Sequence, residues 1–522
     1  MDPAHDLSAA RGSQLSGHET ALIYMGAASI SLIIGDRAAD GTITPLEHLD
    51  KPLPTARDIF RTGTISRSTM EQAASILRDF MQSIREYEIP ASRVRLYTTN
   101  ILSEATNPEV FLNRLQVTTG CDVRLLDEGE MTRLIYLAAA RLLKQNSALE
   151  QGLTMISHIG PGNTRALYFK KGRIAAYTSY RLGIFRAREA VAAMEEAENP
   201  RKLAHFEEQI KGVVDHLAQD FSGVEIHHHV AIGAEIQSVS PHIVPEKHGA
   251  YAVTENQLAN FTEKIAQLTP DQLVRRLHVH YTGSEGIVPA LQTNLALARR
   301  FGDEMIYVPA RDFHRDLILD LMNEGSMSGT FQEEIISSAQ ELAKKYKTDH
   351  KHAEHVATFA QQIFRELRHL HALEPKHELL LRVAAILHEV GMFVSAREHH
   401  KHSMYLILNT ELFGISTEDR TIVALLARYH RRYNPESNHP HFSELSREER
   451  MVVFKLAAIL RIADALDRSH SQRIKTIHLR PQGNRLVIQT PGVDDTTVEQ
   501  IAINSKCDLF REIFGFEVLL TR

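Results

Sequence analysis

The chain has 522 residues, of which 43% are hydrophobic and 24% are charged, and its formal net charge is -6. These values are ordinary for a globular protein, and the length exceeds that of one hydrophobic core, so we expect several domains. The acidic balance argues against a nucleic-acid or acidic-membrane partner, which would need a basic surface.

Targeting signals are not expected at the start of the sequence. The first 18 residues lack the apolar core of a signal peptide and are predicted to be a disordered tail. The most apolar stretch, residues 21–35, is interrupted by Gly26 and Ser31, so we expect no membrane span. Two distant cysteines, Cys121 and Cys507, predict neither a disulfide framework nor a zinc site, which favours a cytoplasmic location.

One pattern occurs twice in the first half of the chain. Residues 19–49 have the order strand, glycine turn, strand, polar turn, strand, and residues 154–183 have it again. Aligned without gaps, the turns match Tyr24 with His158, Gly26 with Gly160 and Ser29 with Asn163. The pattern predicts two similar lobes, although two unrelated hairpins could also produce it. Facing glycine turns could bind phosphate oxygens through their backbone N–H groups.

Strand patterns alternate with amphipathic helices around these repeats, which predicts α/β sheets with helical flanks. The segment Asn323–Thr330 combines glycine and serine with a loss of periodicity and is the predicted linker. We therefore expect a first lobe at residues 19–125, a second lobe at 126–322, a helical domain at 330–471 and a small α/β cap at 472–522.

Histidine and carboxylate side chains recur in the helical half, in or beside very apolar helical patterns. Polar groups in stretches such as AAILHE and ILRIAD would be buried, which is costly unless they are paired or bind a metal. Imidazole and carboxylate together suit divalent transition metals and Mg²⁺, which neutralise phosphate charge and activate water. Accidental clustering is the alternative, because the chain has 29 histidines. The spaced residues are His352, His388, Glu389, His399, His400, His402, His430 and Asp464.

In the order of its parts the chain resembles the exopolyphosphatase and guanosine-pentaphosphate phosphohydrolase (Ppx/GppA) family. The most specific stretches are TTNILSEATNPEVFLNRLQVTTG, RLIYLA, LLLRVAAILHEVGMFVSAREHHKHSMYLILN, LLARYHRR and RIADALDRSH. The resemblance implies a two-lobed actin-like ATPase (ribonuclease H-like) α/β fold, then an all-α HD-type bundle and a small α/β C-terminal cap. It also implies a polyphosphate or guanosine polyphosphate ligand, a divalent metal such as Mg²⁺ or Mn²⁺, no organic cofactor and a homodimer.

Several residues that the resemblance implies for the first active site are replaced. The family's two aspartates that bind metal and phosphate correspond to Tyr24 and His158, and an arginine corresponds to Ser103. The general-base glutamate corresponds to Met131, and Glu130, one residue away, is the remaining catalytic candidate, although this offset turns a helical side chain by about 100°. Phosphate binding is expected from Gly26, Ser29, Gly160, Gly162 and Asn163.

The resemblance to HD phosphohydrolases implies a second centre in the helical domain. His352, the pair His388–Glu389 and Asp464 are its expected metal ligands. Glutamate in place of the usual aspartate adds one methylene group, which can weaken or retune metal binding. Second-metal or phosphate contacts are expected from His402, His430 and Arg431, with Arg428 and Arg432 as alternatives for phosphate.

Three functions follow from these residues. The leading hypothesis is hydrolysis of terminal phosphoanhydrides of polyphosphate or guanosine pentaphosphate between the lobes. This activity would be weakened or lost, because in-line hydrolysis needs a base and cations that the replacements remove. The alternatives are metal-dependent hydrolysis at the HD-type centre, and a non-enzymatic sensor that binds polyphosphate or nucleotide and reports occupancy by lobe closure.

Overall fold

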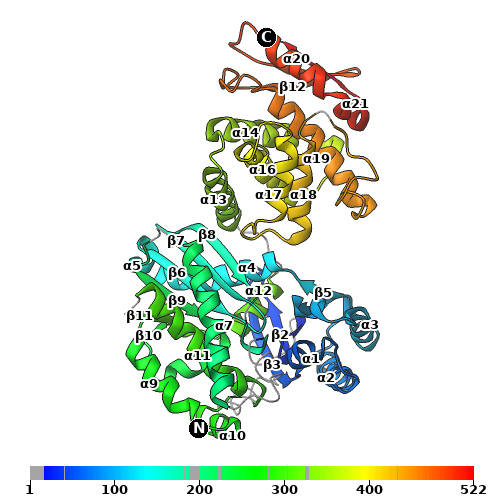
Figure 1. The fold of residues 1–522 in the computed structure, drawn as a ribbon. Helices are drawn as coiled ribbons and strands as arrows, with labels where there is room; N and C mark the ends of the chain where they lie inside the picture. The colour runs from blue at the N-terminus through cyan, green and yellow to red at the C-terminus, as the bar shows by residue number, and fades with distance from the viewer. Residues whose placement is uncertain are drawn as a thin grey trace. The chain divides into compact units, whose positions relative to one another are not determined.

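The computed structural model describes residues 17–39, 41–181, 183–186, 199–221, 225–279, 281–302, 304–323, 329–431 and 433–521. The chain divides into two compact units, Met1–Ser328 and Gly329–Arg522, which are described separately (Figure 1). Most of the expected tail at residues 1–18 and of the expected linker at Asn323–Thr330 lies outside the described residues. No described helix has the length and apolarity that crossing a bilayer requires.

The first sheet of unit 1 has the strand order β3-β2-β1-β4-β5. Its first three strands pair antiparallel, whereas β4 and β5 continue the sheet in parallel with β1. Strands β1 and β2 are almost continuously buried, as is typical of strands covered on both faces. The strands are β1 (Glu19–Met25), β2 (Ser29–Arg37), β3 (Ile43–Pro52), β4 (Val94–Thr99) and β5 (Val123–Leu126). The helices are α1 (Thr55–Thr62), α2 (Arg67–Glu86), η3 (Ala91–Arg93), η4 (Asn100–Glu104) and α3 (Pro108–Thr119).

The second sheet of unit 1 has the order β10-β11-β9-β6-β7-β8. Strands β8-β7-β6 pair antiparallel and β9 joins β6 in parallel, which repeats the arrangement β3-β2-β1-β4. The predicted repeat and the two-lobed α/β part of the fold are therefore confirmed. The strands are β6 (Leu153–Ile159), β7 (Thr164–Lys170), β8 (Arg173–Tyr180), β9 (His228–Ile232), β10 (Ala250–Thr254) and β11 (Met305–Pro309).

Helices flank this second sheet, and Figure 1 shows α7 and α11 lying along it. Helix α7 packs against α11, and both contribute to one apolar core with β6. The helices of this region are α4 (Glu128–Gln145), α5 (Ser147–Gln151), α7 (Asn199–Asp220), α8 (Ala234–Val239), η5 (Ser240–His242), α9 (Glu255–Ala266), α10 (Pro270–Leu277), α11 (Tyr281–Phe301) and α12 (Phe313–Met322).

The two glycine turns close in the same way. The backbone N–H of Gly26 donates to the carbonyl of Ser29, and that of Gly160 donates to the carbonyl of Asn163, both at 2.9 Å. A Cβ atom at Gly183 would lie 2.4 Å from backbone atoms of Gly162, so the chain after β8 packs directly on the second turn. Only glycine allows this close approach, and the contact holds the second turn against the segment that follows β8.

Unit 2 is mainly helical and ends in a small sheet. Helix α16 packs against α13, α14, α18 and α19, and the C-terminal half of α19 is buried on all sides. Its helices are α13 (Gly329–Lys345), α14 (His350–Glu366), α15 (Arg368–His371), α16 (Pro375–Leu387), η6 (Val390–Phe393), α17 (His399–Leu408), α18 (Thr417–Tyr429), α19 (Arg447–Ala465), α20 (Thr497–Lys506) and α21 (Asp508–Phe514). The sheet, ordered β12-β13-β14, contains β12 (His478–Gln482), β13 (Arg485–Gln489) and β14 (Glu517–Thr521).

Helix α17 lies directly against the turn that follows α16. A Cβ atom at Gly391 would lie 2.1 Å from the carbonyl oxygen of His399 and 2.3 Å from the backbone nitrogen of Ser403. The Ser403 hydroxyl accepts a hydrogen bond from the Gly391 N–H at 2.9 Å and donates to the His388 carbonyl at 2.7 Å. These contacts place the histidines of α17 beside His388.

We predict that Gly391→Ala separates α17 from this turn. Because the clash involves backbone atoms, which cannot rotate away, the substitution should lower the free energy of unfolding by about 3 kcal/mol. Urea unfolding measures the loss. Gly212→Ala, at a helical position where a Cβ atom meets nothing within 4 Å, is the matched control and should not destabilise. Equal stability of the two variants would contradict the prediction.

Candidate active site and metal centre

Both glycine turns line a single cavity of about 580 Å³ in unit 1. The turns connect the first two strands of each lobe, so the repeat brings them to one place. All five residues expected to bind phosphate lie on the wall of this cavity: Gly26, Ser29, Gly160, Gly162 and Asn163. Their phosphate-binding role stays a prediction. Because the N–H groups of Gly26 and Gly160 already close the turns, the other backbone N–H groups of the turns would have to bind the ligand.

Neutral rings stand where the resemblance implies two aspartates. Tyr24 and His158 are each 5% exposed, and they pack against His314 and Phe313 of α12 with ring centroids 5.4 and 5.2 Å apart. Burial raises the pKa of Tyr24 to about 12 and lowers that of His158 to about 3. Both side chains are therefore uncharged at neutral pH, and these positions supply no negative charge for a metal ion.

Glu128, at the start of α4, forms a bidentate ion pair with Arg165, a residue of the cavity wall. The Arg165 Nε and Nη2 atoms lie 2.6 and 2.7 Å from the two carboxylate oxygens. Tyr177 and Ser179 also donate hydrogen bonds to this carboxylate, at 3.1 and 3.2 Å. Burial opposes ionisation of Glu128, but these partners outweigh it and hold its pKa at about 2. The charge of Arg165 is thus matched within the protein.

Helix α4 presents Met131, not Glu130, to the cavity among the described residues. The backbone N–H of Glu130 donates to the capping side chain of Asp127, and burial raises the pKa of the Glu130 carboxyl group. Its catalytic role is a prediction that this geometry does not favour, for the reason anticipated from the helical offset: adjacent residues of a helix point in directions about 100° apart.

Glu235 is a cavity carboxylate that the sequence patterns did not single out. It follows Gly233 at the end of β9, and the β6–β9 register pairs Ile232 with His158, which places this segment beside the second glycine turn. Burial raises the pKa of Glu235 to about 7. The available signal was the sequence AIGAEIQSV, in which a carboxylate follows a buried parallel strand and a glycine. Glu235 can therefore gain or lose a proton near neutral pH.

We predict that Glu128→Gln destabilises the protein. Arg165 is 5% exposed, and leaving its charge without a carboxylate should cost about 3 kcal/mol at pH 7. Because the folded-state pKa of Glu128 lies below its ordinary value of 4.5, the stabilisation is present above pH 4.5 and is lost as the pH falls toward 2.

Urea unfolding at pH 7 and at pH 3 tests both statements. The difference between wild type and Glu128→Gln should shrink at the lower pH, and Glu128→Gln/Arg165→Met should cost less than Glu128→Gln alone. Exposed Glu109→Gln serves as the control, with an effect within about 0.5 kcal/mol. A pH-independent difference would contradict the role of this ion pair.

In unit 2, His352, His388 and Asp464 form a buried cluster whose ligand atoms lie within 4.8 Å of one another. The Nε2 atoms of His352 and His388 lie 3.5 and 3.9 Å from the same Asp464 oxygen. Atoms bound to one ion with bonds of about 2.1 Å are spaced by roughly these distances. Neither Nε2 atom has a hydrogen-bond partner among the described residues.

The other ring nitrogens of these histidines are held as in metal sites. His352 Nδ1 donates to Asp467 at 2.9 Å, and His388 Nδ1 donates to the carbonyl of Ala385 at 2.7 Å. Such bonds orient an imidazole and leave its Nε2 lone pair for a metal. Three of the four predicted ligands therefore fit a divalent metal ion.

Lys506 of α20 would compete with a metal ion for the carboxylate of Asp464. Its ammonium group, on a residue 9% exposed, contacts the second Asp464 oxygen. Burial opposes ionisation of Asp464, but Lys506 and His352 together hold its pKa well below the usual value. A cation supplied by the protein thus already balances Asp464.

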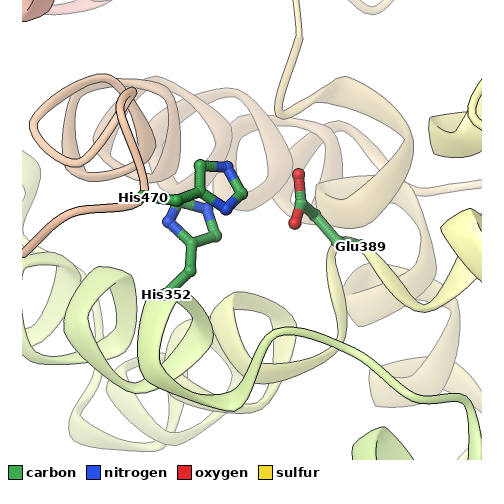
Figure 2. A group of neighbouring side chains, drawn as sticks. All are labelled: His352, Glu389 and His470. Carbon is green, nitrogen blue, oxygen red and sulfur yellow. The ribbon is translucent and has the colours of Figure 1, made fainter.

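Glu389, the remaining predicted ligand, belongs to a different group, with His352 and His470 (Figure 2). The rings of His352 and His470 stack with centroids 3.7 Å apart and planes at 8°. Because an imidazole lone pair lies in the ring plane, an ion between two parallel rings would sit far outside both planes. The buried group with His388 and Asp464 is therefore the better metal site.

His399, not His402, contacts the predicted residue His430. Their Nε2 atoms are 3.3 Å apart, and each Nδ1 atom donates to a backbone carbonyl, that of Ala396 or Ala427. Two bare Nε2 lone pairs at this distance require a proton or cation between them. His402 is partly exposed and has no contact with this cluster in the described part of the chain; Arg431 is exposed, and Arg432 lies outside the described residues.

Comparisons with known proteins cover both units. The family model described as Ppx/GppA phosphatase family matches residues 36–324, and that described as Ppx/GppA phosphatase, domain III, matches residues 336–494. A relative from Aliivibrio fischeri (strain MJ11), named guanosine-5'-triphosphate,3'-diphosphate pyrophosphatase, is 22% identical over 458 residues, covering 84% of this chain and 86% of its own. A protein of the same name from Photobacterium profundum is 21% identical over 491 residues, covering 90% and 91%.

Two solved structures are similar to part of the chain. The crystal structure of the Aquifex aeolicus member of the Ppx/GppA protein family is 18% identical, with a TM-score of 0.45, and covers 59% of this chain and 99% of its own. An exopolyphosphatase from Cytophaga hutchinsonii ATCC 33406 is 14% identical, with a TM-score of 0.48, and covers 58% and 98%.

Proposed function

Because this chain belongs to the Ppx/GppA phosphatase family, we propose that it hydrolyses terminal phosphoanhydrides of polyphosphate or guanosine pentaphosphate in the cavity of unit 1. The observation that carries the proposal is the convergence of both glycine turns on one cavity. Relatives named for guanosine-5'-triphosphate,3'-diphosphate support this substrate class. The family resemblance further supports a cytoplasmic homodimer.

Different cavity residues would have different roles in such a reaction. Backbone N–H groups of the turns would hold phosphate oxygens, and Arg165 on the wall is oriented by Glu128. Glu235 would accept the proton of the attacking water, because its carboxyl group is ionised in part near pH 7. With Tyr24 and His158 in place of two carboxylates, we expect turnover well below that of an enzyme with an intact site.

We predict that Glu235→Gln lowers phosphate release from long-chain polyphosphate or guanosine pentaphosphate by about 10²- to 10⁴-fold, as loss of a general base does. The measurement is phosphate release with Mg²⁺ or Mn²⁺ across pH 5–9. The wild-type rate should rise through about pH 7, the pKa of Glu235, and the variant should lack this rise.

Two further variants make this test specific. Exposed Glu263→Gln on α9 should keep the wild-type rate. Glu130→Gln shows which of the two carboxylates is the general base. Loss of activity in Glu130→Gln with full activity in Glu235→Gln would assign this role to Glu130 on α4. Ligand-dependent thermal stabilisation without any phosphate release would instead favour the sensor hypothesis.

A second candidate function is metal-dependent hydrolysis at an HD-type centre in unit 2. The Nε2 atoms of His352 and His388 lie beside Asp464 and have no hydrogen-bond partner in the part of the chain that the structure describes, which favours this function. A bound Mg²⁺ or Mn²⁺ ion would supply Lewis acidity and an activated water. The chain's own residues fix the ring orientations through Asp467 and Ala385, and they set the competing charge through Lys506.

Metal content tests this centre directly. We predict that Lys506→Met binds Mn²⁺ at least about tenfold more tightly than wild type, because the variant removes a positive charge next to a ligand. His388→Ala should bind at least tenfold more weakly, since it removes a ligand. Titration calorimetry of protein stripped with a chelator gives both affinities, and exposed Lys401→Met is the matched control. Equal Mn²⁺ affinity in all four proteins would exclude the metal centre.

A further inference from the structure

His400, in the first turn of α17, is a buried side chain that has no hydrogen-bond partner among the described residues. It is 4% exposed, and neither of its ring nitrogens makes a hydrogen bond with the described residues. A buried polar group in this state destabilises the fold unless something else satisfies it. Its orphaned nitrogens therefore point to a ligand.

Positive charge surrounds this imidazole. Burial, followed by the charges of Arg428, Arg431, His399 and Lys401, lowers the pKa of His400 to about 4. The adjacent acid, Glu398, is exposed and contacts Lys401, which neutralises that lysine. The uncompensated charge near His400 thus belongs to the two arginines.

These two arginines lie at the C-terminal end of α18 and just beyond it. Arg428, on α18, has a buried Nη1 atom with no hydrogen-bond partner, and Arg431 is exposed. Within the described part of the chain, neither makes an ion pair or hydrogen bond. By contrast, Arg461 in the same unit bonds to Tyr429, Tyr433, Asn434 and Asp508. Arg461 is thus satisfied within the protein, whereas the buried Nη1 atom of Arg428 is not satisfied by the described residues.

The N-terminus of α17 adds further donors. Glu398 precedes the helix in a left-handed conformation with φ 54° and provides no side-chain cap. The helix has 10 residues. The N–H of Lys401 already donates to the Glu398 carbonyl at 2.8 Å, so the donors of the first turn without a backbone partner among the described residues are the N–H groups of His399 and His400. The dipole of the helix also favours an anion at this end.

We propose that His400, Arg428, Arg431 and the N-terminus of α17 form a binding site for a phosphate group. Phosphate fits because it is dianionic, offers several acceptor oxygens and binds arginine in a bidentate manner. Tyr433, 69% exposed, stacks on His400 with ring centroids 6.2 Å apart and would cover one side of the ligand.

The site adjoins the candidate metal centre. His399, the neighbour of His400, has its Nε2 atom 3.3 Å from that of His430, whose ring lies 4.9 Å from the ring of His388. A phosphomonoester or phosphoanhydride held here would therefore lie next to the residues of that centre, where it could be hydrolysed. This catalytic role rests on the second proposed function, whereas phosphate binding itself requires no metal.

The test is thermal unfolding of the full chain in chelator-containing buffer, with and without inorganic phosphate at about 10 mM. Wild type should gain about 3 °C over sodium chloride of equal ionic strength. Arg428→Met should lose most of this gain, and exposed Arg447→Met, the matched control in unit 2, should keep it. Equal shifts with phosphate and chloride, or an unchanged shift in Arg428→Met, would overturn the proposal.

His400→Leu sharpens the test because two effects oppose each other. Leucine removes an unpartnered polar group, so the variant should melt at or above the wild-type temperature without phosphate and should lose the phosphate shift. A lower melting temperature with a normal phosphate shift would show that His400 has only a packing role and would overturn its place in the site.

Ser29→Asp excludes binding in the cavity of unit 1. Its added negative charge should repel phosphate from that cavity and leave the phosphate-dependent rise in melting temperature intact. Loss of this rise in Ser29→Asp alone would show that phosphate binds in unit 1 and would overturn the proposal. Mn²⁺ affinity is measured separately, so a failed metal centre with a persistent phosphate shift distinguishes the two hypotheses.

Discussion

The buried carboxylate of Asp464 is the charge on which the arrangement of unit 2 depends. An ionised carboxylate that is 4% exposed must be compensated, and its partners come from three other helices: His352 on α14, His388 at the end of α16 and Lys506 on α20. The ion cluster therefore ties the small sheet region, through α20, to the helical bundle. It also gives a metal ion a prepared ligand set and a competitor at the same residue.

In unit 1, neutral rings lie beside the glycine turns of the cavity. Tyr24 and His158 occupy strand ends next to the glycine turns, and the rings of α12 fill the space beside them. Glu235, next to the second turn, is a cavity carboxyl group whose pKa is raised to about 7. The described arginine on the wall, Arg165, pairs with Glu128, and the wall carboxylate Glu104 pairs with Arg186, while Asp50 and Asp312 add further carboxylates to the wall. The cavity would thus hold phosphate mainly by neutral donors.

Much of this fold could be predicted from the sequence. The two glycine turns lie between alternating apolar strands, and this local signal was sufficient to predict the repeated sheets. Contacts between residues that are distant in the sequence were harder to predict. Lys506 follows Asp464 by a turn, a hairpin and a helix, and nothing in its local pattern indicates a buried ammonium group. His399, His400 and His402 occupy three directions around one short helix, so their spacing could not tell which ring meets His430.

The same limit explains Glu130 and Glu235. The family resemblance placed Glu130 within one residue of the general-base position. Adjacent residues of a helix point in different directions, however, and it is Met131 that lines the cavity. Glu235 has no helical periodicity to reveal it, since α8 has only 6 residues. Its burial follows from a parallel strand pairing between β6 and β9, a long-range contact.

The two units differ in whether their arginines are paired with carboxylates. In unit 1, the described arginines on or near the cavity, Arg165 and Arg186, end in bidentate contacts with carboxylates, so little positive charge is left to attract a polyanion. Near His400 the two arginines form no ion pair with the described residues, and the buried imidazole, whose pKa is lowered to about 4, supplies no negative charge to balance them. Uncompensated charge is retained at a cost in stability, so it marks where the ligand, and not the protein, supplies the missing negative charge.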